Sequence, residues 1–113
     1  MHDIQAHLRF YPVSAQKVRL IVDLVRGMSA NEAMDVLRFE TKAPAATVRK
    51  LLTSAVANAE ENFGVSRDDL YVAKIVADEA PTRKWRRFGA RGRFKPVLRR
   101  SSHVTVVLRE RES

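Results

Sequence analysis

The chain has 113 residues, of which 45% are hydrophobic, and this suits one small domain with a modest core. It contains no cysteine, which excludes disulfides and thiolate metal sites, and no apolar run approaches the roughly 20 residues of a membrane span. The N-terminus has neither a signal-peptide nor a transit-peptide pattern, so we expect a cytoplasmic protein with no membrane partner. The 21 basic and 13 acidic residues give a formal net charge of +8.

A strand and then a helix are predicted at the start of the chain. Residues 4–11 alternate in polarity, which is typical of a half-buried strand. The side expected to face the core carries Ile4, Ala6, Leu8 and Phe10. Pro12 closes the strand, and Ser14 is expected to cap a helix that runs to about Arg26. Gly27 suits the position just after that helix.

Two further helices are predicted next. Ser29-Ala-Asn-Glu32 forms a capping box and predicts a short second helix. A third helix should begin at Thr41 or Lys42, since Pro44 is tolerated in a first turn, and should end at Gly64. Its apolar stripe is predicted to be Val48, Leu52, Ala55, Ala59 and Phe63.

The last third of the chain predicts two strands joined by a hairpin. Residues 70–78 are nearly continuously apolar, which favours a central strand, and residues 102–108 alternate as a second strand. The segment between them has Gly89 and Gly92 near its middle, as in a β-hairpin. The predicted fold is therefore α+β: three helices packed on a small three-stranded antiparallel sheet, with a long basic β-hairpin arm. Val18, Ile21, Leu52, Ala55, Val76 and Val106 should meet in its core.

The positive charge is concentrated in one segment of a single predicted domain. Residues 82–100 hold nine Lys or Arg and no acidic residue, whereas the rest of the chain has 12 basic and 13 acidic residues. We therefore divide the domain 1–113 into a body, residues 1–81 and 101–113, and an arm, residues 82–100. Nine mutually repelling cations favour a polyanionic partner, most often nucleic acid, bound in a salt-sensitive way. A solvated basic tail or nuclear address is less suited to a segment with strands on both sides.

Aromatic side chains are interleaved with the cations of the arm. Trp85, Phe88 and Phe94 are suited to stacking on exposed RNA bases. The alternative is that Trp85 and Phe94 pack on each other across the hairpin. A second candidate site is the start of the first helix, where Lys17 and Arg19 could hold a phosphate, although simple capping by Ser14 explains that segment equally well.

Catalytic and metal-binding patterns are not found. The carboxylates in Glu60-Glu61, Asp68-Asp69 and Asp78-Glu79 are sequence neighbours and therefore diverge. His2, His7 and His103 lack ligand spacing, so a surface or sheet-face role is favoured for them. The segment 89–92 lacks the features of a phosphate loop. We therefore predict no catalytic residue, no metal and no cofactor, and a protein that is not an enzyme.

Four segments carry a resemblance to a known family. They are SAQKVRLIVDLVRG at 14–27, ANAEEN at 57–62, DEAP at 78–81 and RSSHVTVV at 100–107. In these segments, and in the spacing from Asp78 through the arm to His103, the chain resembles large-subunit ribosomal protein twenty-two of bacteria. Ala15, Ala80, Gly89 and Phe94 depart from that family's usual residues.

The resemblance implies a structural constituent of the large ribosomal subunit that binds its RNA. The body would lie on the solvent side, and the arm would line the polypeptide exit tunnel, where its tip influences macrolide sensitivity. Implied partners are large-subunit ribosomal RNA, neighbouring ribosomal proteins and the nascent polypeptide, with the protein a monomer in the cytoplasmic ribosome. The predicted RNA-binding residues are Lys17, Arg19, Arg83, Lys84, Trp85, Arg86, Arg87, Arg91, Arg93, Lys95, Arg99 and Arg100. The predicted tunnel tip is Phe88, Gly89, Ala90, Arg91, Gly92 and Arg93.

Two other classes of function fit the sequence less well. An architectural DNA-bending protein also uses basic β-ribbon arms, but it inserts an apolar wedge at the tip, and Pro96 lies off the predicted tip. A small ribonuclease would need an acid–base pair near the arm, and residues 82–100 contain no carboxylate or histidine.

Overall fold

A computed structural model describes residues 3–80, 83–88 and 94–111. In chain order the elements are β1 (Ile4–Tyr11), α1 (Ala15–Val25), α2 (Ala30–Phe39), α3 (Ala43–Asn62), the 3-10 turn η1 (Arg67–Asp69), β2 (Leu70–Glu79), β3 (Arg83–Phe88), β4 (Phe94–Arg99) and β5 (Ser102–Glu110). Strands β1, β5 and β2 form an antiparallel sheet in that order, and β3 pairs with β4 in a separate ribbon. The α+β prediction is confirmed.

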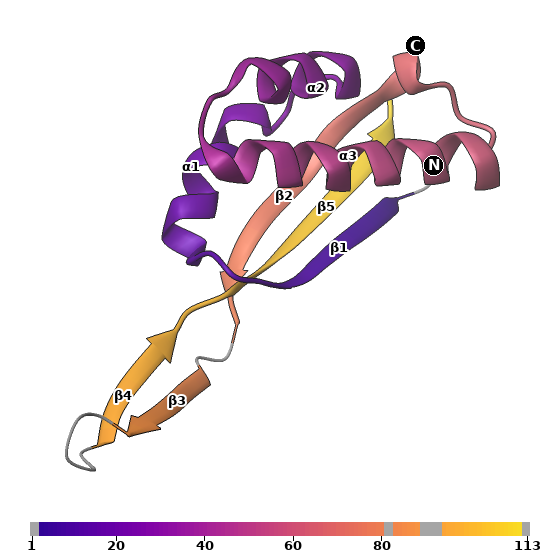
Figure 1. Ribbon diagram of the computed structural model, residues 1–113. Helices are drawn as coiled ribbons and strands as arrows, with labels where there is room; N and C mark the ends of the chain where they lie inside the picture. The colour runs from indigo at the N-terminus through magenta and orange to yellow at the C-terminus, as the bar shows by residue number, and fades with distance from the viewer. Residues whose placement is uncertain (1–2, 81–82, 89–93, 112–113) are drawn as a thin grey trace.

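The helices and the three-stranded sheet enclose the core, and the ribbon extends away from them (Figure 1). Helix α3 lies across the sheet, while α1 lies beside β2. Fully buried large side chains come from every layer, among them Ile4, Ile21, Leu52, Ile75 and Leu108. The ribbon makes the molecule long, 67 × 26 × 18 Å along its principal axes.

The helix ends follow the predicted capping residues with one exception. Ser29 Oγ accepts a hydrogen bond from Glu32 N at 3.2 Å, as the capping box predicts. Gly27 and Gly64 follow α1 and α3 with positive φ angles of 83° and 65°. Ser14 occupies the N-cap position of α1 as predicted, but the prediction that its hydroxyl makes the capping bond is wrong. Its carbonyl accepts from Lys17 N and Val18 N.

The prediction that residues 70–78 form the central strand is wrong. Strand β5 is central, and β2 lies at an edge of the sheet. This edge is covered by polar groups of the α1 segment: Arg19 Nε donates to Ala77 O at 3.0 Å, and Arg26 Nη2 donates to Ile75 O at 2.8 Å. Two backbone hydrogen bonds, from Gly27 N to Val72 O and from Val72 N to Met28 O, cover a further part of this edge. A covered edge strand can be as apolar as a central one, because its backbone groups are not open to water.

Two β-bulges account for further errors in the predicted core. In β2, Val72 lies opposite Leu108 and Lys74 lies opposite Val107, so Ala73 between them is one extra residue. The alternation of buried and exposed side chains therefore reverses after Ala73. Ile75 and Ala77 are consequently buried, and Val76, predicted to be in the core, is only half-buried.

The second bulge lies in β1, where the register shifts between Leu8 and Tyr11. Phe10 has a φ angle of +55° and is 50% exposed, so the prediction that it faces the core is wrong. Tyr11 packs against the core instead. The apolar stripe predicted for α3 is buried except at its last residue: Phe63 lies just after the helix and is 42% exposed.

Candidate nucleic-acid interface

The two described parts of the basic segment, residues 83–88 and 94–99, pair as the predicted hairpin. Strands β3 and β4 pair antiparallel from the Arg83–Arg99 pair to the Phe88–Phe94 pair. The ribbon leaves the body between the end of β2 and the start of β5 (Figure 1). At this junction Ala80 N donates to Ser101 O at 3.0 Å.

The backbone register places cation opposite cation in this ribbon. Arg83 lies opposite Arg99, and Arg87 lies opposite Lys95. Like charges directly opposite each other destabilise an antiparallel pair, and a two-stranded ribbon is marginal in water even without them. The register therefore favours a partner that supplies compensating negative charge.

The register also decides how the aromatic residues are distributed along the ribbon. Trp85 lies opposite Val97, and Phe88 lies opposite Phe94. The alternative in which Trp85 and Phe94 form a direct cross-strand pair is therefore wrong, because the register puts them three positions apart.

The predicted tip lies outside the described residues except for Phe88, which ends β3. These undescribed tip residues are Gly89, Ala90, Arg91, Gly92 and Arg93.

The candidate residues on the body lie where the ribbon begins. Arg100 is exposed between β4 and β5, and Lys17 and Arg19 are exposed on α1. The Arg19 Nε bond to Ala77 O fixes this part of α1 beside the last residues of β2. Figure 1 shows the start of α1 close to the point from which the ribbon extends. The fold therefore makes the predicted RNA-binding residues of the body continuous with the arm.

A second cluster of cations was missed by the sequence analysis. We call it the basic groove; its cations are Arg38, Arg49, Lys50 and Arg67, and they line a groove of about 520 Å³ between α2, α3 and η1. No basic run marks these residues, because they come from three separate elements. Only the predicted packing of the two helices could have suggested them.

Two histidines and one ion pair of the body have structural partners. His7 Nδ1 lies 3.2 Å from Thr105 Oγ1, and His103 Nδ1 accepts from Phe10 N at 3.1 Å, which confirms a sheet-face role for both histidines. Asp3 Oδ1 accepts from Arg109 Nε at 2.7 Å, and this hydrogen bond lowers the pKa of the Asp3 carboxyl and raises that of Arg109.

The described residues form neither a metal-binding cluster nor a membrane-spanning helix. No group of three or more His, Cys, Asp or Glu residues is placed to hold a metal ion in the described part of the chain. No helix among residues 3–80, 83–88 and 94–111 is both long and apolar enough to cross a membrane.

Comparison with known proteins agrees with the sequence resemblance. The family described as "Ribosomal protein L22p/L17e" matches residues 6–109, a range that includes both the body and the arm. The chain belongs to this family. Members that it resembles are the proteins named large ribosomal subunit protein uL22 of Thermoanaerobacter sp. (strain X514) and of Thermoanaerobacter pseudethanolicus (strain ATCC 33223 / 39E). Each is 46% identical over 110 residues, which cover 97% of this chain and 99% of the relative.

Membership of the ribosomal protein L22p/L17e family decides between the classes of function weighed from the sequence. The family is one of structural ribosomal proteins and not of enzymes. Neither the family match nor the named relatives support an architectural DNA-bending protein.

Proposed function

We propose that this protein is a structural constituent of the large ribosomal subunit in the cytoplasm and that it binds the subunit's RNA. Family membership over residues 6–109 supports the assignment to the subunit. The register of the ribbon supports RNA as the ligand, because phosphates supply the negative charge that opposed cations need. Neighbouring ribosomal proteins are further partners, and the protein acts as a monomer there.

The proposed RNA contacts run from the base of the arm to its tip. Lys17, Arg19 and Arg100 contact RNA where the arm leaves the body. Within the arm the contacts are made by Arg83, Lys84, Trp85, Arg86, Arg87, Arg91, Arg93, Lys95 and Arg99. The guanidinium groups suit phosphate oxygens, with which they form two parallel hydrogen bonds.

The arm, residues 82–100, is proposed to line the polypeptide exit tunnel, while residues 1–81 and 101–113 form the body outside it. Residues 88–93 form the tip and meet the nascent polypeptide. The length of the molecule supports this division: the long axis of 67 Å is more than twice the next, 26 Å.

The test compares two variants of the full-length protein with equal loss of charge. In the first, Arg83, Arg87, Lys95 and Arg99 are changed to Gln, which removes the opposed cations of the register. In the control, four exposed cations of the body are changed to Gln: Arg9, Lys42, Lys74 and Arg111. Affinity for large-subunit RNA is measured across a series of salt concentrations.

The arm variant should bind more weakly, and its slope of log affinity against log salt should be shallower by about 3, at 0.7–0.9 per phosphate contact. The control should show a smaller loss of affinity and a smaller change in salt slope. Equal losses in both variants would place the phosphate contacts outside the ribbon. A wild-type protein that does not co-sediment with large subunits would remove the proposed function itself.

A further inference from the structure

The basic groove is built from one side of each of two helices. Its lining consists of Asn31, Met34, Asp35, Arg38, Arg49, Lys50, Thr53 and Arg67. On α2 the lining residues are spaced three or four apart from position 31 to position 38, so they share one side of that helix. Positions 49, 50 and 53 form the facing side of α3, and Arg67 enters from η1.

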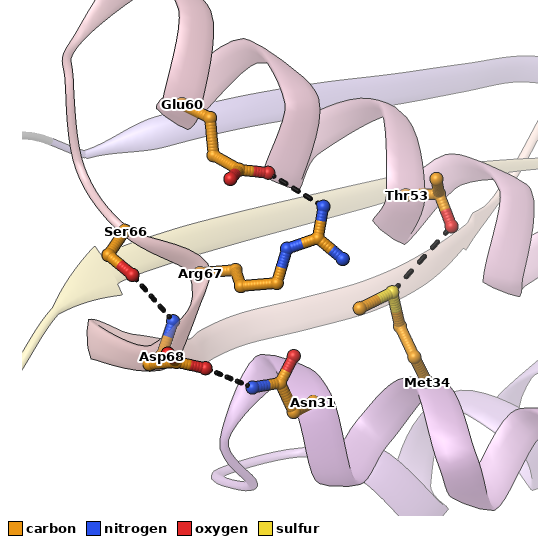
Figure 2. Close-up of polar contacts among 7 residues, drawn as sticks. All are labelled: Asn31, Met34, Thr53, Glu60, Ser66, Arg67 and Asp68. Atoms are coloured by element: carbon orange, nitrogen blue, oxygen red, sulfur yellow. Dashed lines mark hydrogen bonds and ion pairs between the residues drawn. The ribbon is translucent and has the colours of Figure 1, made fainter.

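The walls of the groove are held together by polar contacts that Figure 2 shows. Asn31 Nδ2 donates to Asp68 Oδ1 at 2.8 Å, which ties α2 to η1. Arg67 Nη2 donates to Glu60 Oε1, also at 2.8 Å, which ties η1 to α3. In Figure 2 the Arg67 side chain lies between α3 and α2. These ties connect α2, η1 and α3 and hold Asn31 and Arg67 before any ligand arrives, so less ordering of the groove walls is needed on binding.

Three of the four cations in the groove lack an acidic partner among the described residues. Arg67 pairs with Glu60, whereas Arg38, Arg49 and Lys50 form no ion pair in the described parts of the chain. Asp35 is the one acidic residue that lines the groove. This local excess of positive charge lies in a body whose residues outside 82–100 carry a net charge of −1.

We propose that the basic groove is a second RNA-binding site, which holds the phosphate backbone. This inference rests on the proposed function, since it takes ribosomal RNA as the ligand. Two unpaired guanidinium groups and one ammonium group match phosphate oxygens by charge and by hydrogen-bond donors. The lining contains no aromatic ring on which a base could stack, so the contacts are to the backbone and independent of base sequence.

An acidic protein segment fits the groove less well than RNA does. Protein interfaces are typically centred on aromatic and apolar anchors, with few charges at their core. Met34 is the only apolar residue of this lining, and four of its eight residues are cations.

The test uses the full chain with two cations of the groove neutralised, Arg38→Gln and Lys50→Gln. Both side chains are exposed and form no ion pair among the described residues, so a thermal melt should be unchanged. The matched control is Arg9→Gln with Lys74→Gln, which removes two exposed cations from β1 and β2. Binding to purified large-subunit RNA is measured against salt concentration.

The groove variant should bind several-fold more weakly than the control, with a salt slope shallower by about 1.5 for two lost phosphate contacts. If the wild type binds RNA and the two variants have equal affinity and equal salt slope, the groove is not an RNA-binding site. The proposed function would still stand. Unchanged affinity for purified RNA combined with reduced incorporation into subunits would identify a protein ligand and also overturn it. Absence of binding by the wild type would remove both proposals.

Discussion

Ser102 is buried at the junction of body and arm, and its hydroxyl has no hydrogen-bond partner among the described residues. It begins β5 and lies opposite both Tyr11 and Glu79 in the register. A buried hydroxyl without a partner costs stability, because its hydrogen bonds to water are lost on folding.

We expect Ser102→Ala to raise the free energy of unfolding by about 1 kcal/mol, since it removes an unsatisfied polar group. Urea melts of both proteins measure the difference. The neighbouring Ser101→Ala change, at a half-buried residue, serves as the control and should stay within about 0.5 kcal/mol of the wild type. Destabilisation by Ser102→Ala would show that the hydroxyl does have a partner.

Leu52 tests the core at the scale of one side chain. It is fully buried on α3, so Leu52→Ala should cost about 2–5 kcal/mol, as the deletion of buried methyl groups does. Leu20 on α1 is 57% exposed and provides the same chemical change as a control, with an expected cost below about 0.5 kcal/mol. A urea melt in which the Leu52→Ala variant loses no more than this control would place Leu52 outside the core.

The Asp3–Arg109 pair should produce a small dependence of stability on pH. Its hydrogen bond lowers the pKa of Asp3 below the ordinary value of 3.8, so it stabilises the folded state above that pH. The contribution is lost as the pH falls through the lowered pKa. Asp3→Asn should therefore be slightly less stable than the wild type near neutral pH, and the difference should vanish in acid. A difference that persists in acid would assign the effect to something other than the carboxylate charge.

At the scale of elements, the bulges decide which residues of a strand face the helices. The alternating pattern of residues 4–11 predicts the bounds of β1, but the pattern does not reveal that one residue near Phe10 is extra. Ala73 has the same effect in β2. A bulge depends on the pairing of two strands that are distant in sequence, so local alternation does not reveal it.

The arm should be separable from the folding of the body. We expect deletion of residues 83–99, with a short turn joining β2 to β5, to leave the helical circular dichroism of the body unchanged. Its binding to large-subunit RNA should be weaker, with a shallower salt slope, because most of the excess cations are removed. The basic groove should give the shortened protein some remaining salt dependence. An undiminished slope would place the phosphate contacts elsewhere, whereas loss of the helical signal would show that the ribbon supports the body.

At the scale of the whole molecule, the elongated shape places the arm and the basic groove in different parts of the protein. The arm leaves the body between β2 and β5, while the groove lies between α2, α3 and η1 (Figure 1). Two separate sites of positive charge would restrain the orientation of the protein on folded RNA more than one site would.

Arg91 provides the test of the tunnel assignment in assembled ribosomes. We expect Arg91→Glu to leave the stability of the isolated protein unchanged, and to alter macrolide sensitivity or stalling on tunnel-sensing nascent peptides. The physical reason is that a carboxylate placed beside RNA phosphates is repelled by them. Arg9→Glu on the body controls for the change in net charge. Full incorporation of the Arg91→Glu protein with unchanged drug response and stalling would contradict the assignment.

The sequence by itself determined the elements, the class of the fold, the family and the basic arm. These depend on local patterns: the alternation in residues 4–11, the capping box at Ser29, the glycines after α1 and α3, and an uninterrupted run of cations. Each is a property of neighbouring residues, so it can be recognised before the chain is folded.

Only the tertiary structure decided how distant residues meet. It placed β2 at an edge covered by Arg19 and Arg26, and it put Arg83 opposite Arg99. It also gathered the basic groove from α2, α3 and η1, although the average charge of the body gives no sign of it. Strand order, register and a groove between helices all depend on packing between segments far apart in the chain, and a local pattern carries no information about that packing.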